Sequence, residues 1–267
     1  MIPKVTHQIW FQGWNNLPEK YHGYTEFLSI LNPNWEHVKW DEKSLRLECE
    51  KFSSEALAKF DGFDNMIQKV DFGRYVVLYN YGGVSIDCDT ECLRPLDKIP
   101  GVDRYDFIIG KNPLNRLENK VTSFGLSKNL IIVNNATLCV SKESLIMKQF
   151  IEFLIKNESW NEDVMLDTQL KTGPLIMSIF INQHLDNLDI NILDSDVFEP
   201  WGNVTRRTIL NHMYDQSWTH FGPYPVKVYR ILKNNLAAMI IFVLGVLLFF
   251  FIRKFVSYRY KQVLESV

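Results

Sequence analysis

Two acidic side chains are spaced so that they can bind a metal ion. Asp87 and Asp89 stand one residue apart, after a Gly82-Gly83 break and a short strand-like segment at residues 84–86 (VSI). Because side chains alternate in an extended segment, both carboxylates fall on one side of the chain and can converge on one ion. Carboxylate oxygens suit hard cations such as Mg²⁺ and Mn²⁺, which also bind diphosphates. The same spacing also occurs in solvated turns, so the preceding residues decide between the two interpretations.

Those preceding residues predict a helix that ends beside the acidic pair. Apolar residues recur at helical spacing through residues 72–79. Asp71 and Arg74 are three residues apart and share a face of that helix, either as a surface ion pair or as ligand contacts next to the metal. Gly82 and Gly83 are expected to end the helix with positive φ and to let the backbone approach a ligand closely.

A longer block of residues connects these features with a known family. It consists of Asp71, Arg74, Tyr75, Leu78, Tyr79, Tyr81, Gly82, Gly83, Asp87, Asp89, Leu93, Arg94, Pro95 and Leu96. The block resembles the signature of the D-x-D sugar transferases, and more narrowly glycosyltransferase family 32, which includes initiating α-1,6-mannosyltransferases and mannosyl-inositol-phosphorylceramide synthases. Residues 2–10 (IPKVTHQIW) resemble the first strand of that family. Residues 172–174 (TGP) and 212–218 (HMYDQSW) resemble its later landmarks.

The resemblance implies a GT-A-like fold, with an open mixed sheet flanked by helices, and a set of site residues. Asp87, Asp89 and Arg74 would be catalytic, with Asp89 bound directly to Mn²⁺ or Mg²⁺ and Asp87 in contact with ribose or a metal-bound water. Arg74 and Asp71 would hold the sugar hydroxyls or the phosphate of a nucleotide-sugar donor. The family comparison suggests His212 as a further metal ligand, and His220 is an alternative. Retention of anomeric configuration is implied, and no residue is assigned as a covalent nucleophile.

The full expected set of donor-binding residues is His7, Trp10, Asp71, Arg74, Tyr75, Gly82, Gly83, Ser217 and Trp218. Several of these residues have a purely structural alternative. His7 can instead be a core histidine, His212 a histidine at a helix end, and Trp218 a core aromatic residue. Residues 172–174 either place a helix amino terminus near the substrate or only cap that helix.

Periodicity predicts the elements that position these residues. Strands are expected at residues 4–11, 35–40, 84–86, 107–110, 130–133 and 190–193, and helices at 21–31, 44–60, 65–79, 144–156 and 174–184. Strands alternate with helices through the first half, which predicts a parallel-rich α/β sheet. Ligands bind such sheets at the carboxyl ends of the strands, where Asp87 and Asp89 would lie.

Composition sets further bounds. The 267 residues suffice for one large domain or two small ones. A net charge of −2 gives no electrostatic case for nucleic acid as a partner. The four cysteines, Cys49, Cys88, Cys92 and Cys139, lack metal-site spacing and are expected to be reduced and isolated.

A membrane span is expected near the carboxyl end. Residues 236–252 contain no charge and would form a helix of about 26 Å, just short of a hydrocarbon core of roughly 30 Å. Flanking basic side chains can extend the span by snorkelling. The expected division is a GT-A-like catalytic domain at 1–223, a linker at 224–235, a transmembrane helix at 236–252 and a short basic tail at 253–267. No cleavable signal peptide is expected at the amino end.

The span also bears on the acceptor, because a tethered domain meets lipid-linked acceptors at high local concentration. The preferred hypothesis is transfer of mannose from GDP-mannose to inositol-phosphoryl-ceramide or a similar glycolipid. Alternatives are a UDP-sugar-dependent hexosyltransferase acting on a glycan or protein, and a non-catalytic membrane protein that binds a cation for structure. A single-pass protein of the Golgi or ER is expected. Three sequons at Asn135, Asn157 and Asn203 permit a lumenal catalytic part, and the opposite orientation stays open.

Overall fold

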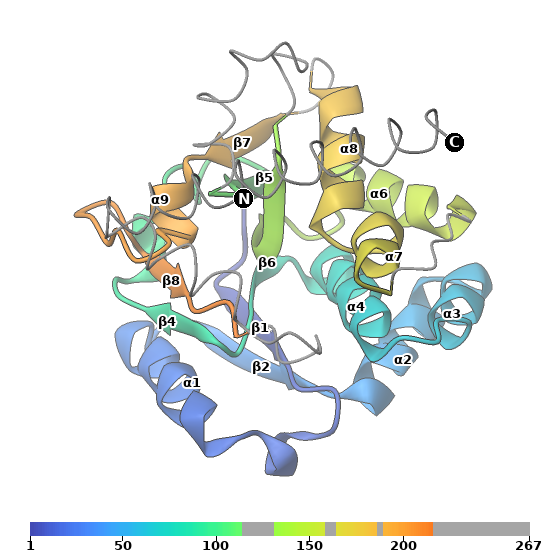
Figure 1. Ribbon diagram of the computed structural model, residues 1–267, viewed down its shortest axis with the longest axis horizontal. Coiled ribbons are helices and arrows are strands. Elements are labelled where there is room, and N and C mark those ends of the chain that lie inside the picture. The colour runs from blue at the N-terminus through green and yellow to red at the C-terminus, as the bar shows by residue number, and fades with distance from the viewer. Residues whose placement is uncertain (114–130, 158–163, 186–188, 216–267) are drawn as a thin grey trace, which may run out of the picture. The chain divides into compact units, whose positions relative to one another are not determined.

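The computed structural model describes residues 1–113, 131–157, 164–185 and 189–215 (Figure 1). The chain divides into two compact units, Met1–Met213 and Tyr214–Val267, and all the helices and strands described below lie in the first. The expected linker, transmembrane helix and basic tail fall outside the described residues. Within the described part of the chain, no helix has both the length and the apolar character needed to span a bilayer.

A mixed sheet of six strands forms the centre of this unit, in the order β2-β1-β3-β6-β5-β7. The strands are β1 (Val5–Ile9), β2 (Glu36–Trp40), β3 (Gly83–Ile86), β5 (Phe107–Lys111), β6 (Val133–Val140) and β7 (Ile190–Leu193). β1 is parallel to both β2 and β3, and β7 is parallel to β5. β6 is antiparallel to β3 and β5. The expected α/β class with an open mixed sheet is therefore confirmed.

Two short strands pair outside the main sheet. β4 (Thr90–Cys92) and β8 (Leu210–His212) are antiparallel, with Thr90 opposite His212. The sequence pattern predicts neither strand, since three residues are too few to establish an alternation. Their pairing brings the carboxyl-terminal part of the unit to the residues that follow Asp89.

Helices cover both faces of the sheet (Figure 1). They are α1 (Glu19–Leu31), α2 (Glu42–Phe52), α3 (Ser54–Asp61), α4 (Met66–Tyr81), α6 (Leu145–Lys156), α7 (Val164–Lys171), α8 (Pro174–His184) and α9 (Ser195–Phe198), with short 3₁₀ turns η1 (Trp14–Asn16) and η2 (Leu96–Lys98). Neighbouring residues of one strand enter different cores: Ile109 packs with the α4 and α6 side, and Ile108 with the α1 and α9 side. Both faces of the central strands are therefore buried, as in covered α/β sheets.

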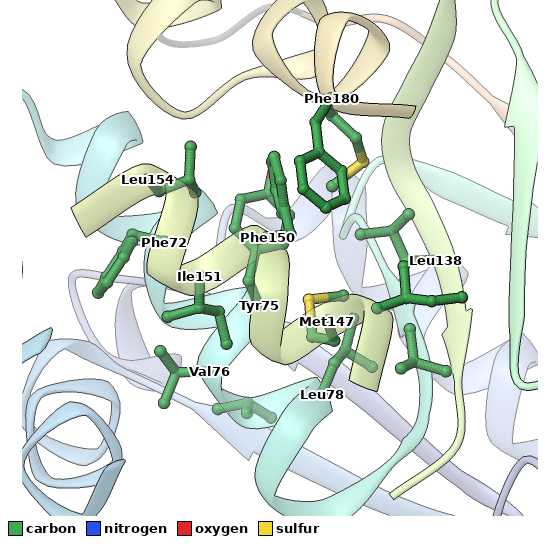
Figure 2. Packing of buried hydrophobic residues seen from close by; sticks show 14 of the residues in the cluster. Phe72, Tyr75, Val76, Leu78, Leu138, Met147, Phe150, Ile151, Leu154 and Phe180 are labelled. Atoms are coloured by element: carbon green, nitrogen blue, oxygen red, sulfur yellow. The ribbon is translucent and has the colours of Figure 1, made fainter. Parts of the chain in front are cut away.

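The larger core holds α4 in place, and α4 carries two of the candidate site residues. Figure 2 shows α6 lying against α4, with Phe150 between Tyr75 and Phe180. The ring centroid of Phe150 lies 5.0 Å from that of Tyr75 and 5.1 Å from that of Phe180. Fully burying one such aromatic side chain contributes about 1.5–3 kcal/mol. The core therefore fixes the helix face that presents Asp71 and Arg74.

Two of the expected element bounds are wrong. The single helix predicted at residues 44–60 is two helices, because Ser53 is extended with φ of −171° and its side chain accepts a hydrogen bond from the Ala56 amide at 3.0 Å. Ser53 thus caps a new helix. The strand predicted at residues 130–133 instead begins at Val133 and runs to Val140 with every residue buried. Its asparagines and threonine conceal the strand from an analysis of apolar periodicity.

Candidate active site

Asp87 and Asp89 lie in the turn that joins β3 to β4, at the carboxyl ends of β1 and β3. The Asp87 amide donates to the Ala136 carbonyl at 3.1 Å, which extends the β3–β6 pairing by one residue. The Thr90 amide then donates to the Asp87 carbonyl at 3.1 Å and closes the turn. The two carboxylates meet because the chain turns, and not by alternation along a strand as expected. Their position at the strand ends is as predicted.

His212 joins these carboxylates from the far end of the unit. Its Nε2 atom lies 3.3 Å from Asp89 Oδ1 and 3.9 Å from Asp87 Oδ2. One ligand atom from each of the three residues lies within 4.8 Å of the others, a spacing that suits a single metal ion. The Met213 amide donates to the Asp89 carbonyl at 3.0 Å and holds the end of β8 against the turn. The helix-end alternative for His212 is therefore wrong, because this residue ends a strand.

The charges around His212 oppose the effect of burial. Desolvation lowers its pKa, but the carboxylates of Asp89 and Glu199 outweigh that effect, and the pKa is raised well above 6.5. The His212 side chain is 10% exposed, that of Asp89 14% and that of Asp87 28%. A cation entering here would take the place of the imidazolium proton as the positive partner of the carboxylates.

Arg74 is buried and supports Asp87 directly. Its guanidinium donates to Asp87 Oδ1 and to the Asn135 carbonyl oxygen. Arg74 is only 6% exposed, as is Asp71, so the surface ion-pair interpretation of these two residues is wrong. Desolvation raises the pKa of Asp87, and the neighbouring guanidinium opposes that rise without cancelling it. Arg74 fixes one oxygen of Asp87 and leaves Oδ2 on the side of His212.

Asp71 belongs to a second hydrogen-bonded layer behind Arg74. It accepts from Asn135 Nδ2 at 2.9 Å and from Thr172 Oγ1 at 3.4 Å. Burial raises its pKa to about 7, against the opposing effect of Arg74. Its carboxyl group is thus held by two polar side chains that come from β6 and from the start of α8.

Tyr75 and residues 172–174 complete that layer. The Tyr75 hydroxyl donates to the Thr172 carbonyl at 2.7 Å and accepts from Asn135 Nδ2 at 2.8 Å. Gly173 is the N-cap residue of α8 and Pro174 occupies its first turn, as expected for a helix start. The TGP segment therefore begins a helix and also contacts the Asp71–Tyr75 face of α4.

His7 has both ring nitrogens engaged inside the protein. Nε2 lies 2.7 Å from the Gly82 carbonyl, and Nδ1 accepts from Trp40 Nε1 at 3.1 Å. Burial lowers the pKa of His7 to about 4, although the bond to Gly82 opposes this. This is the arrangement of the core-histidine alternative, and a donor contact by the ring would require one of these bonds to break.

Gly82 and Gly83 have φ angles of 66° and 102°, which confirms the expected positive φ. The space beside them is taken by the protein itself. A Cβ atom on Gly82 would lie 2.5 Å from the Lys142 amide nitrogen, and one on Gly83 would lie 2.3 Å from the Val5 carbonyl oxygen. Close packing of the chain therefore explains both glycines without a ligand, and room for a donor at these positions stays a prediction.

Trp10 follows β1 and lies in an aromatic cluster beside the acidic turn. Its ring centroid is 5.6 Å from that of Tyr21, and its Nε1 donates to the Asn16 carbonyl at 3.1 Å. The cluster packs around Cys88, the residue between the two acidic positions. The structure thus brings Trp10 to the metal-ligand turn, whereas Ser217, Trp218 and His220 lie outside the described residues.

Comparison with known proteins places the acidic turn within a described family region. Residues 18–106 match the family model described as "Glycosyltransferase sugar-binding region containing DXD motif". This segment is therefore similar to that family. The DXD motif is Asp87-Cys88-Asp89. The glycosyltransferase resemblance drawn from the sequence is confirmed.

Named relatives match a little over a third of the chain. Inositol phosphoceramide mannosyltransferase 3 of Schizosaccharomyces pombe is 36% identical over 98 residues, which are 37% of this chain and 27% of the relative. The initiation-specific alpha-1,6-mannosyltransferase of Candida albicans is 33% identical over 102 residues, covering 36% and 26% respectively. The chain thus spans about a quarter of the length of these relatives. The solved structure of the PaToxG glycosyltransferase superposes with a TM-score of 0.44 at 15% identity, covering 69% of this chain and 70% of that one.

The sequence analysis missed two residues of the candidate site. Asn135 binds Asp71, Arg74 and Tyr75 from β6, and a longer strand prediction would have placed it beside α4. It is 7% exposed, so this sequon is inaccessible in the folded protein. Glu199 lies 3.5 Å from His212 Nδ1 and is 2% exposed. No local pattern identifies Glu199, because it meets His212 only when the end of α9 lies against β8.

Proposed function

We propose that this chain is a metal-dependent, retaining glycosyltransferase that moves a hexose from a nucleotide sugar to a membrane glycolipid. Mannose from GDP-mannose is the preferred donor, and inositol-phosphoryl-ceramide the preferred acceptor. The observation that carries the proposal is the convergence of Asp87, Asp89 and His212 at the edge of a sheet, within a chain whose DXD segment matches a sugar-binding family. A GT-A-like arrangement is part of the proposal.

The residues present fit a divalent cation. Two carboxylates and an imidazole offer ligand atoms within 4.8 Å of one another. An imidazole nitrogen in the set favours Mn²⁺ over Mg²⁺, since Mg²⁺ takes oxygen ligands almost throughout. The chemistry supplied by such a cation is neutralisation of the charge that builds on a diphosphate leaving group.

Residues around the proposed cation position orient its ligands. Arg74 donates to Asp87 Oδ1 and so directs Oδ2 towards His212. The guanidinium also supplies a buried positive charge beside the site, which suits a diphosphate. Asp71 and Asn135 form a polar layer behind it.

The names of the relatives support mannose as the transferred sugar and inositol phosphoceramide as the acceptor. Several are inositol phosphoceramide mannosyltransferases or mannosyl phosphorylinositol ceramide synthases, and one is an initiating mannosyltransferase. The apolar residues 236–252 agree with a lipid acceptor and with a single-pass protein of the Golgi or ER. Membrane contact and location both belong to the proposal.

A donor panel tests the function. The full chain, in detergent with Mn²⁺, is incubated with GDP-mannose, UDP-glucose or UDP-galactose, with and without inositol-phosphoryl-ceramide, and the released nucleotide and glycosylated lipid are measured. We expect acceptor-dependent release from GDP-mannose. Release only from a UDP-sugar would replace the donor and acceptor by the UDP-dependent alternative. Mn²⁺ binding without turnover of any donor would support the non-catalytic alternative and contradict the proposal.

A further inference from the structure

A buried carboxylate lies behind the histidine of the proposed metal site. Glu199 Oε1 is 3.5 Å from His212 Nδ1, and the other ring nitrogen faces Asp89 at 3.3 Å. The imidazole therefore stands between a carboxylate at the back and two carboxylates at the front. Glu199 is 2% exposed, so solvent does not weaken its attraction for the ring as it would at the surface.

The position of Glu199 is fixed by its own backbone. Its amide donates to the Ser195 carbonyl at 2.7 Å at the end of α9. The Ile209 amide, just before β8, donates to the Val197 carbonyl at 2.9 Å. The segment that carries Glu199 and the strand that carries His212 are therefore linked by a direct backbone hydrogen bond.

We propose that Glu199 is a positioning residue that accepts the Nδ1–H of His212 and so presents Nε2 to a divalent cation held by Asp87 and Asp89. A histidine that binds a metal through one nitrogen commonly donates its other N–H to a carboxylate, which fixes the ring and its tautomer. The inference rests on the proposed function, because it requires a cation at this position. Glu199 is not among the three residues whose ligand atoms lie within 4.8 Å of one another.

A metal-binding measurement tests this without any turnover. The affinity of the full chain for Mn²⁺ alone is measured by titration calorimetry for the native protein, Glu199→Gln and Glu199→Asp. We expect an affinity about 10- to 100-fold lower in both variants, since Gln loses the charge and Asp draws the carboxylate back from the ring. Glu48→Gln is the matched control, because Glu48 is also a buried carboxylate, 4% exposed, but is bound to Asn80, Tyr81 and Lys51 on α4 and α2. The Glu48→Gln variant should bind Mn²⁺ with the native affinity.

A double variant separates positioning from a general structural role. If Glu199 acts through the ring, Glu199→Gln has no further effect on Mn²⁺ affinity in a His212→Ala background. An equal loss in both backgrounds, or native affinity in both Glu199 variants, would overturn the inference and leave the proposed function intact. If the native protein binds Mn²⁺ no better than Asp89→Asn, the metal site itself is refuted and the proposed function fails with it.

Discussion

Among the described residues two histidines are buried, His7 and His212, and their surroundings differ. His7 binds a backbone carbonyl and an indole N–H, both neutral partners, and its pKa is lowered to about 4. His212 is surrounded by the carboxylates of Asp87, Asp89 and Glu199, and its pKa is raised well above 6.5. Burial acts on both rings in the same direction, so the partners decide the outcome.

This difference indicates which histidine supports the fold and which supports chemistry. A neutral ring with both nitrogens satisfied stabilises the contact between β1 and α4. A ring held among carboxylates can exchange its proton for a metal ion. Both histidines fall in segments that resemble family landmarks, and only their partners in the folded protein distinguish them.

The largest expected effect concerns the His212 site. Asp89→Asn should lower transfer from GDP-mannose by roughly 100- to 1000-fold, as expected when one electrostatic contact at a developing charge is removed. The variant should still fold, because His212 keeps Asp87 beside Nε2 and Glu199 beside Nδ1, and a cooperative unfolding transition in urea checks this. Full activity in this variant would remove the metal role from the acidic turn.

Substitution of His7 should lower the stability of the protein and leave metal binding unchanged. His7→Leu leaves the Gly82 carbonyl and Trp40 Nε1 without their partner. At about 1–3 kcal/mol for each of the two buried unsatisfied groups, we expect the free energy of unfolding to fall by roughly 2–6 kcal/mol. Urea denaturation measures this loss, and calorimetry on the folded variant should give native Mn²⁺ affinity. A stable variant that no longer binds Mn²⁺ would contradict the division between the two histidines.

The two histidines should also make the free energy of unfolding depend on pH in opposite directions. The pKa of His7 is about 4 in the folded protein and 6.5 in the unfolded chain, so the unfolded chain binds the extra proton between these values. The free energy of unfolding should therefore fall as the pH drops from 6.5 to 4, by roughly 3 kcal/mol in total. For His212 the folded pKa is raised, so without metal its contribution is present below pH 6.5 and is lost as the pH rises through the raised value.

Urea unfolding of the metal-free protein from pH 4 upwards measures these slopes. In His7→Gln, which keeps a polar side chain but does not titrate, the fall between pH 6.5 and 4 should be reduced by the amount assigned to His7. An identical fall in the native protein and in this variant would show that other groups cause it.

The smallest expected effect is the pH dependence of metal binding. Because a cation displaces the proton of His212, Mn²⁺ affinity should rise with pH by up to about tenfold per pH unit below the raised pKa. Calorimetry between pH 6 and 8, repeated in buffers of different ionisation enthalpy, detects the released proton. His212→Ala should bind more weakly and lose most of this dependence. An affinity independent of pH in the native protein would mean that the ring is already neutral.

Much of the fold follows from local pattern in the sequence. The helix that carries Asp71 and Arg74, the positive φ of Gly82 and Gly83, and the strand before Asp87 all come from residues within one stretch of the chain. The acidic pair of the DXD motif could be predicted as a candidate metal site for the same reason, since its two carboxylates are only one residue apart in the sequence.

The features that the sequence did not predict depend on contacts between distant segments. β8 becomes a strand only by pairing with β4, and that pairing brings His212 to Asp89. Asn135 lies in a polar segment that is buried because α4 and β3 cover it. Ser53 interrupts a helical pattern by capping the next helix with its own side chain. None of these is a property of local periodicity.

Anomalous diffraction from crystals grown with Mn²⁺ and GDP-mannose tests the central claim most directly. The account predicts a manganese peak within coordination distance of Asp87, Asp89 and His212, with the diphosphate bound to the same ion. A nucleotide bound elsewhere in the protein, with no manganese at these three residues, would contradict it.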